Sequence, residues 1–310
     1  VGVASRSFSR SCVCLTNSEL MKKIKQLRLQ TSAPVVDCKE AILEADGDIE
    51  LAKKNLIKKG LTQMEKMQER VSSMGSLFIA SSGHGQAAVV EMNCQTDFVS
   101  SNESFKNVLS LCANSMLTNS SSGEWLSRKV GEHASFYHAN IDWLKSLPFQ
   151  GSETISDAMT QLNYSTGEKC EITRAGILSA TDAVIGSYVH QGRISALVSL
   201  NPCPESEEQK EILRKFGRNL AIHVGGFHPT AIGSISSAGP TEAKEEEYKD
   251  AEVLGEVVPQ ELMVQPFSMV GGGSVGSNLQ KLRNQIGLPV QVGSFVRWEF
   301  GKEEETFAGF

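Results

Sequence analysis

The pattern of apolar residues between residues 19 and 60 predicts three short helices. Pro34 suits the first turn of the second helix, which runs to about Glu44, because proline has no amide hydrogen to lose there. Asp48 is a good N-cap for the third helix, and Gly60 is expected to end it. The apolar residues that recur at helical spacing are Leu20, Ile24, Leu27, Ile49, Ala52 and Leu56.

Beyond residue 60 the pattern changes. Residues 61–73 are polar and punctuated by Met, which predicts a helical or flexible linker. Two β-prone runs, 76–80 and 86–94, flank a glycine-containing turn and predict a β-hairpin. Residues 102–117 return to helical spacing, so a sheet with a covering helix is expected to begin here.

The second half of the chain repeats this hairpin-and-helix pattern. Residues 118–166 show no firm periodicity, and three β-prone runs follow, with Gln191-Gly192 as a tight turn between the second and the third. An amphipathic helix begins near Glu205 and is expected to end at Gly225-Gly226. The three runs are 171–180, 183–190 and 193–200, and the last predicted elements are a helix at 275–286 and a strand at 290–300.

Together these elements predict an α+β protein with antiparallel sheets, in which a small helical module precedes two similar sheet-plus-helix subdomains. The first eighteen residues contain Arg6 and Arg10 and no acid, which is typical of the end of a mitochondrial transit peptide, with an ordinary disordered N-terminus as the alternative. Because the chain does not begin with Met, we expect residues upstream. The predicted boundaries are 1–18 for this remnant, 19–60 for the helical module, 61–73 for the linker, and 74–170 and 171–310 for the two core subdomains.

The charge distribution favours a protein partner over nucleic acid or a membrane. The net charge is -6, and acids outnumber bases after residue 70, so the body lacks the broad basic surface expected of a nucleic-acid binder. No stretch reaches the about 20 apolar residues that a bilayer span requires. The 7 cysteines are scattered and odd in number, which favours reduced thiols over a disulfide framework.

Motifs of catalytic chemistry are absent from the sequence, which has no Walker A, no GxGxxG after a strand, no HExxH and no GxSxG. Cys12 and Cys14 lack the second ligand pair that a zinc site needs. His223 lies on the apolar face of a predicted helix and is expected to be a core residue. We therefore expect no catalytic residues, no metal and no cofactor, and a binding or regulatory protein rather than an enzyme.

Four ordered motifs resemble those of the elongation factor Ts family and cover most of residues 19–300. The most distinctive is Asn93-Cys94-Gln95-Thr96-Asp97-Phe98-Val99, which follows the predicted hairpin. The other motifs are Leu27-Arg28-x-x-Thr31 with 36–41 and 44–52, then Gly186-Ser187-Tyr188-Val189-His190, and finally His223-Val224 with Gln265-Pro266-Phe267 and 295–299. The chain departs from the family at Ser32, where Gly is usual, and at Val35 and Val36, where larger apolar residues are usual.

The resemblance also implies a fold and a cellular compartment. It implies that the N-terminal module has the three-helix fold of ubiquitin-associated domains. Bacterial members carry a coiled-coil insertion before the Gln-Pro-Phe segment, whereas here only a short segment separates the acidic run 241–256 from Gln265. This short form resembles the mitochondrial branch, which implies location in the mitochondrial matrix.

Elongation factor Ts accelerates release of GDP from the GTPase elongation factor Tu, and the resemblance implies the same partner, in its GDP-bound and nucleotide-free forms, for this chain. It implies that Asp97 and Phe98, with Val99 beside them, form a wedge that enters the GTPase domain and disturbs its Mg²⁺ and phosphate site. His190 would support this wedge from the second hairpin. The other implied contacts with the partner are Arg28, Val35, Val36 and Lys39, and the segment 265–267 against a further domain.

Each of these residues also has an ordinary structural interpretation. Phe98 alone would be a core aromatic residue, and Asp97 would be an N-cap for the helix near Asn102. Val35 and Val36 alone would be core residues, and Arg28 and Lys39 alone would be solvated cations on helix surfaces. Two other functions compete: a ubiquitin-binding adaptor built on the N-terminal module, and an RNA-binding protein, which the acidic body disfavours.

Overall fold

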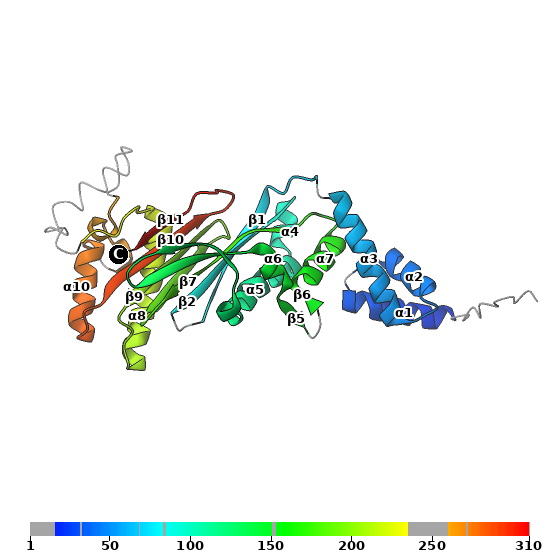
Figure 1. Cartoon of the computed structure of the whole chain (residues 1–310), viewed down its shortest axis with the longest axis horizontal. Coiled ribbons are helices and arrows are strands. Elements are labelled where there is room, and N and C mark those ends of the chain that lie inside the picture. Colours follow the sequence, from blue (N-terminus) through cyan, green and yellow to red (C-terminus); the bar gives the residue numbers. More distant parts are fainter. Residues whose placement is uncertain are drawn as a thin grey trace, which may run out of the picture. The chain divides into compact units, whose positions relative to one another are not determined.

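The structure is a computed structural model that describes residues 16–31, 33–67, 69–82, 85–150, 153–234, 260–270 and 272–309. The chain forms two compact units, which we call the helical unit (Val1–Val71 with Ser156–Lys169) and the sheet unit (Ser72–Ile155 with Cys170–Phe310). Most of the predicted transit-peptide remnant and the segment between α8 and η3 in which a coiled-coil insertion would lie fall outside the described residues. Figure 1 shows the order of the elements along the chain.

Three helices form the N-terminal part of the helical unit, as predicted. They are α1 (Asn17–Thr31), α2 (Val35–Glu44) and α3 (Ile49–Met67). Asp48 caps α3, because its Oδ1 accepts hydrogen bonds from the backbone N–H groups of Glu50 and Leu51 at 2.9 and 3.1 Å. The core that these helices share consists of Ile24, Leu27, Ala33, Cys38, Ala41, Ile42, Ala45, Ala52 and Leu56.

A fourth helix, α7 (Ile155–Thr166), completes the helical unit. Its Tyr164 is buried in the shared core. A Cβ atom at Gly60 would lie 3.3 Å from Cγ2 of Thr160 and 3.5 Å from Cβ of Tyr164, so Gly60 provides room for α7. The prediction that Gly60 ends α3 is therefore wrong: this glycine serves a helix–helix contact, and α3 continues to Met67.

A five-stranded sheet forms the first half of the sheet unit, with strand order β1-β2-β7-β4-β3. The predicted hairpin is present as the antiparallel pair β1 and β2. Strand β7, which the sequence pattern assigned to the second β-rich unit, pairs with β2 and β4 of this sheet and not with β8. The strands are β1 (Met74–Ser81), β2 (Gln86–Cys94), β3 (Trp125–Val130), β4 (Ala134–Ala139) and β7 (Glu171–Ala180).

A four-stranded sheet with order β11-β10-β9-β8 forms the second half. The hairpin β8–β9 turns at Gln191 and Gly192, which both have positive φ, as predicted for a tight turn. The strands are β8 (Val184–His190), β9 (Ile194–Asn201), β10 (Gln291–Glu299) and β11 (Thr306–Gly309), and the helices that accompany them are α8 (Glu207–Phe227) and α10 (Val275–Ile286).

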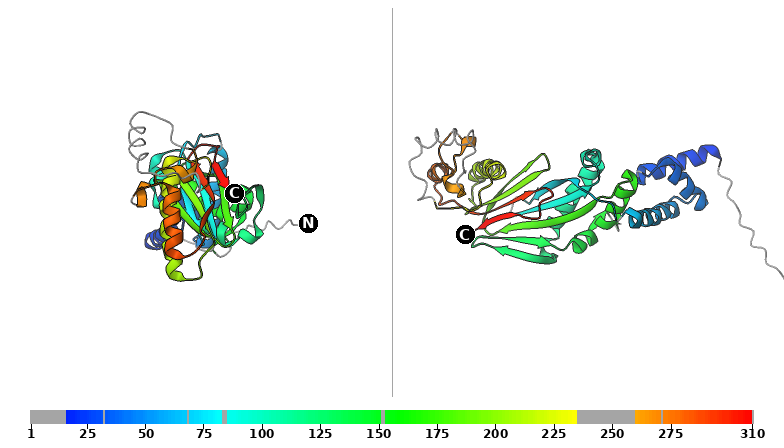
Figure 2. Two further views of the ribbon diagram at one scale, coloured as in Figure 1. Left: turned by 90° about the vertical axis from the view of Figure 1, so that its left-hand side faces the viewer. Right: turned by 90° about the horizontal axis from the view of Figure 1, so that it is seen from above.

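The two sheets pack face to face, and helices cover their outer faces. Apolar residues from both sheets, including Leu77, Phe136 and Trp298, form the core between them. Helix α5 (Glu103–Thr118) contacts β1 and β2 from the other side, while α8 and α10 share a core with the four-stranded sheet (Figures 1 and 2). The shorter elements are α4 (Asp97–Ser101), η1 (Ser120–Ser122), α6 (Ile141–Ser146), β5 (Pro148–Gln150), β6 (Glu153–Thr154), η3 (Leu262–Val264) and η4 (Ser268–Val270).

Helix α8 does not end at its glycine pair, contrary to prediction. It runs through Gly225 and Gly226 to Phe227 and ends at His228, which has a left-handed φ of 48°. A Cβ atom at Gly225 would lie 3.6 Å from Cδ1 of Tyr188, so this glycine leaves room for an aromatic ring of β8. Among the described residues, no helix is both long and apolar enough to cross a bilayer.

Candidate partner-binding surface

The motif from Asn93 to Val99 joins β2 to the short helix α4 and is anchored at several points. Asn93 donates its side-chain amide to the carbonyl oxygen of Ser72 at 3.2 Å, and Cys94 is fully buried. Thr96 is the N-cap of α4, and its hydroxyl accepts a hydrogen bond from the N–H of Val99. Val99 is 8% exposed, so it fixes the helix to the body of the unit.

These anchors leave Asp97 and Phe98 at the surface. Phe98 is 83% exposed, whereas a phenyl ring of a folded protein is usually buried. The interpretation of Phe98 as a core residue is therefore wrong. Asp97 is also exposed, and it occupies the first turn of α4 rather than an N-cap position, which Thr96 takes. The motif thus holds a carboxylate and a phenyl ring side by side in solvent on a fixed turn of helix.

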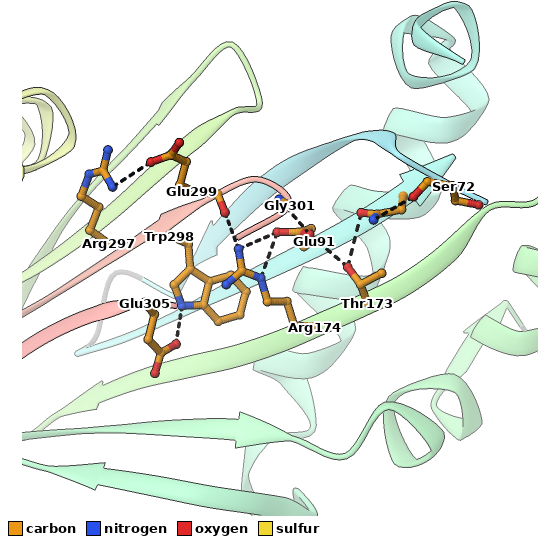
Figure 3. Close-up of polar contacts among 10 residues, drawn as sticks. Ser72, Glu91, Thr173, Arg174, Arg297, Trp298, Glu299, Gly301 and Glu305 are labelled. Atoms are coloured by element: carbon orange, nitrogen blue, oxygen red, sulfur yellow. Dashed lines mark hydrogen bonds and ion pairs between the residues drawn. The ribbon is translucent and has the colours of Figure 1, made fainter. Parts of the chain in front are cut away.

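A buried ion pair lies on the strand that leads to this motif (Figure 3). Glu91 of β2 is 3% exposed, and its Oε2 accepts hydrogen bonds from Nε and Nη2 of Arg174 at 2.9 and 2.7 Å. The Arg174 guanidinium lies over the Trp298 ring, 4.4 Å from its centroid, and also donates to the carbonyl oxygen of Glu299. Gly301 donates its N–H to Glu91 at 3.3 Å. The pair therefore ties β2 and β7 to the turn that follows β10.

The β8–β9 turn is joined to the same region by backbone hydrogen bonds. Leu77 of β1 donates its N–H to the carbonyl oxygen of Gly192 at 2.8 Å. Phe300 donates to the carbonyl oxygen of Arg193 at 2.7 Å, and the Arg193 guanidinium lies 4.7 Å from the centroid of the Phe300 ring. Helix α4 also contacts β1, so α4 and this turn both lie against one edge strand of the five-stranded sheet.

His190 is the last residue of β8, and its side chain is exposed. Its Nδ1 atom lies 2.8 Å from the hydroxyl oxygen of Tyr188. The structure places His190 and Phe98 on elements that contact β1, and each side chain is open to solvent. Tyr188 is part of the motif quoted above, but the sequence alone offered no reason to single it out.

The four remaining predicted residues lie on the helical unit and are all exposed. Val35 and Val36, in the first turn of α2, are 45% and 66% exposed, so the interpretation of these residues as core is wrong. Arg28 and Lys39 are exposed on α1 and α2. Other exposed apolar residues of this unit, among them Leu29 and Leu43, were missed. Leu29 follows the buried Leu27 by two positions and so lies away from the core stripe of its helix.

In the segment from Gln265 to Phe267, the two outer side chains face the core and not solvent. Gln265 and Phe267 are both fully buried, so the expectation that this segment grips another domain is corrected. Gln265 Oε1 lies 2.9 Å from Nε2 of His223, which is also fully buried, and the prediction of His223 as a core residue is confirmed. Burial lowers the pKa of His223 to about 4, against the weaker opposing effect of the hydrogen bond to Gln265.

The exposed side chains described above form contact surfaces. Within the described ranges, no three His, Cys, Asp or Glu side chains gather as metal ligands. The sheet unit presents an aromatic ring beside a carboxylate, and an imidazole at the end of β8. The helical unit separately presents apolar and cationic side chains. Such mixed apolar and charged surfaces are suited to binding a protein.

Comparisons with known proteins agree with the motifs. Residues 95–272 match the family model described as "Elongation factor TS". The chain is 32% identical to an "Elongation factor Ts" of Xanthobacter autotrophicus, over 92% of this chain and 94% of the relative, and 32% identical over the same shares to one of Azorhizobium caulinodans. It is 28% identical to an "Elongation factor Ts, mitochondrial" of Oryza sativa, over 92% of this chain and 83% of the relative. With matches over most of its length and motifs held as described above, the chain belongs to the elongation factor Ts family.

Proposed function

We propose that this protein is a guanine-nucleotide exchange factor that binds elongation factor Tu and promotes GDP release during mitochondrial translation elongation. It does so without catalysing a chemical reaction of its own. Membership of the family supports the partner and the class of function. The observation that carries the proposal is the exposure of Phe98, 83%, on a helix whose flanking residues are anchored.

An exchange factor must bind the nucleotide-free GTPase better than the GDP-bound form, because only differential binding shifts an equilibrium. In the proposed mechanism, the Phe98 ring inserts between helices of the GTPase domain of the partner. The Asp97 carboxylate then enters the polar network around the partner's Mg²⁺ ion. Both effects displace the phosphate-binding loop, and GDP leaves without any covalent step.

One side chain does not supply enough free energy for this mechanism. Shifting an equilibrium from 1:99 to 99:1 requires about 5.5 kcal/mol of differential binding, whereas an interface hot spot contributes about 2–4 kcal/mol. We therefore assign the remaining differential binding to Asp97 and His190, which act with Phe98, and we assign affinity for both forms of the partner to the exposed residues of the helical unit. The contact residues in the proposal are Asp97, Phe98 and His190 on the sheet unit and Arg28, Val35, Val36 and Lys39 on the helical unit. Val99, which was also expected to contact the partner, is buried and instead holds α4 in place.

The mitochondrial location rests on two observations. The Oryza sativa relative, which matches over most of both chains, is named as mitochondrial. The first eighteen residues also contain Arg and Ser without acids, in the manner of a transit peptide. Fractionation of cells that express the complete gene product, with any residues upstream of Val1, tests the location, and recovery in the cytosolic fraction would contradict it.

The decisive experiment measures release of a fluorescent GDP analogue from purified mitochondrial elongation factor Tu, with and without the full chain. We expect release to accelerate with increasing concentration of the chain and to saturate. Release that stays at its spontaneous rate would contradict the proposal. The competing adaptor function is tested by titrating the full chain with ubiquitin, for which we expect no binding, since the relatives over most of the chain are elongation factors.

A further inference from the structure

Tyr188 and His190 lie on the same side of β8, because residues two apart on a strand point to one face. The Tyr188 hydroxyl oxygen is 2.8 Å from Nδ1 of His190, and the two ring centroids are 6.0 Å apart. The His190 side chain is exposed, whereas Tyr188 is half-buried. With Nδ1 occupied by the phenol, Nε2 is the nitrogen that His190 offers to another molecule.

The phenol ring of Tyr188 is held by the packing between β8 and α8. Tyr188 packs against the core that α8 and α10 share with the sheet. A Cβ atom at Gly225 of α8 would lie 3.6 Å from Cδ1 of Tyr188 and 3.7 Å from Cγ2 of Ile194, so both side chains lie against this glycine. A side chain at Gly186 of β8 would overlap the backbone of α8 at Gly217, so the helix lies directly on the strand. Rigid elements therefore fix the hydroxyl that contacts His190.

The direction of this hydrogen bond depends on which nitrogen of the imidazole ring carries the proton. A neutral histidine has one N–H donor and one acceptor nitrogen, and the partner of one nitrogen determines the role of the other. If the Tyr188 hydroxyl donates its proton to Nδ1, the ring proton lies on Nε2. The hydroxyl proton then bonds to the lone pair of Nδ1, and the Nε2–H group of His190 is the donor that faces solvent.

We infer that Tyr188 is a positioning residue that makes His190 present its Nε2–H group as a hydrogen-bond donor to an acceptor oxygen, a carbonyl or a carboxylate, on the GTPase partner. The inference rests on the proposed function, because it takes His190 to contact elongation factor Tu. It adds a residue and a protonation pattern that the contact requires. Tyr188 itself acts through His190 and does not touch the partner.

The test is the Tyr188→Phe variant of the full chain, which removes one oxygen atom and keeps the ring that packs on α8. At a limiting concentration of the chain, we expect GDP release from elongation factor Tu to slow about threefold to tenfold, the range for the loss of one hydrogen bond at an interface. Tyr137→Phe is the matched control: it removes a hydroxyl from a half-buried tyrosine of β4, and release should be unchanged.

Two further measurements separate positioning from a general structural effect. In a His190→Ala background, adding Tyr188→Phe should have no further effect on GDP release, because Tyr188 acts through the imidazole. Nitrogen-15 NMR of the His190 ring should show the Nε2–H form in the wild-type chain and a mixture of both forms in Tyr188→Phe. A free chain suffices for this measurement.

The outcomes decide the inference in either direction. Equal slowing by Tyr188→Phe with and without the His190 side chain would overturn it, as would ring forms that the variant leaves unchanged. Unchanged GDP release in His190→Ala would overturn the role of His190 while leaving exchange itself intact. If the wild-type chain fails to accelerate release at all, the proposed function fails first, and the NMR result then reports on the Tyr188–His190 hydrogen bond alone.

Discussion

The ion pair between Glu91 and Arg174 stabilises the strand that leads to the exposed motif at Asp97 and Phe98. Glu91 is buried and Arg174 is half-buried, and the two side chains compensate each other's charge. Replacing Glu91 by Leu leaves the Arg174 guanidinium buried without its carboxylate, so we expect a loss of about 3–5 kcal/mol in the free energy of unfolding. Urea denaturation followed by circular dichroism measures it.

The double variant Glu91→Leu with Arg174→Met is the control for this prediction. It replaces the buried pair by apolar side chains of similar volume, which often costs little stability. We expect the double variant to recover most of the stability that the single variant loses. A double variant as unstable as the single one would show that the charges are not the reason.

The buried His223 leads to a second prediction, on how the free energy of unfolding depends on pH. Burial lowers its pKa from 6.5 to about 4, so the unfolded chain binds a proton at a higher pH than the folded chain does. The free energy of unfolding therefore falls as the pH is lowered from 6.5 toward 4. Between pH 6.5 and 4.5, this one group accounts for about 2 kcal/mol.

The measurement compares urea denaturation of the wild-type chain and of His223→Gln at pH 6.5 and 4.5. Stopping at pH 4.5 avoids Glu305, whose carboxylate loses its stabilising contribution only below that pH. Burial alone raises the pKa of Glu305, but hydrogen bonds from His138 and Lys129 outweigh it and lower the pKa from 4.5 to about 2. A variant whose stability falls as steeply as that of the wild type would contradict the assignment to His223.

The packing of α8 on β8 is the feature of most consequence at the scale of elements. A methyl group at Gly186 would overlap the backbone of Gly217, so Gly186→Ala must move the strand away from the helix. We expect a loss of about 1–3 kcal/mol in stability. Thermal unfolding with and without the substitution measures this loss.

Gly226 provides a matched comparison on the same helix. A Cβ atom there would meet no atom within 4 Å, and its backbone is helical. Because alanine restricts the unfolded chain more than glycine does, Gly226→Ala should stabilise the protein by about 0.5–1 kcal/mol. Equal effects of the two substitutions would contradict the close packing of α8 on β8.

These glycines also show how far the elements could be predicted from sequence. The local signals were sufficient for both hairpins and for the cap at Asp48, because turns and caps depend on neighbouring residues. Gly60 and Gly225 were taken as helix ends, although each lies inside a helix at a contact with a distant element. The position of α7 in the helical unit depends on Tyr164, which lies far along the chain from the helices that it contacts, and no local pattern reports such a contact.

The candidate surface was predicted from sequence only with the help of the family motifs. Periodicity alone favours Phe98, Val35 and Val36 as core residues, because a pattern of apolar positions does not say which of them remain uncovered. The resemblance assigned all three to the surface, and the structure finds them exposed. It also misassigned the segment at Gln265 and Phe267, which is buried, since a motif carries structural and functional residues alike.

At the scale of the whole molecule, the proposal divides the work between the two units. The helical unit contributes affinity through Val36 and Lys39, and α4 of the sheet unit contributes the displacement of GDP. The double variant Val36→Ala with Lys39→Ala should therefore raise the concentration for half-maximal GDP release about threefold to tenfold, as expected for the loss of about 1 kcal/mol at an interface. The rate at saturation should stay the same, and a reduced saturating rate would contradict this division.

If the exposed Phe98 ring drives exchange, its removal must slow GDP release even when the partner is saturated with the chain. The rate of GDP release from mitochondrial elongation factor Tu is measured at saturating concentrations of the wild-type chain, of Phe98→Ala, and of Leu126→Ala as a control that removes another exposed apolar side chain of the sheet unit. We predict that Phe98→Ala lowers the saturating rate about thirtyfold, the effect of an aromatic hot spot worth about 2 kcal/mol. The thermal stability of Phe98→Ala and the saturating rate of Leu126→Ala should equal those of the wild type. A saturating rate for Phe98→Ala equal to that of the wild type would contradict the account.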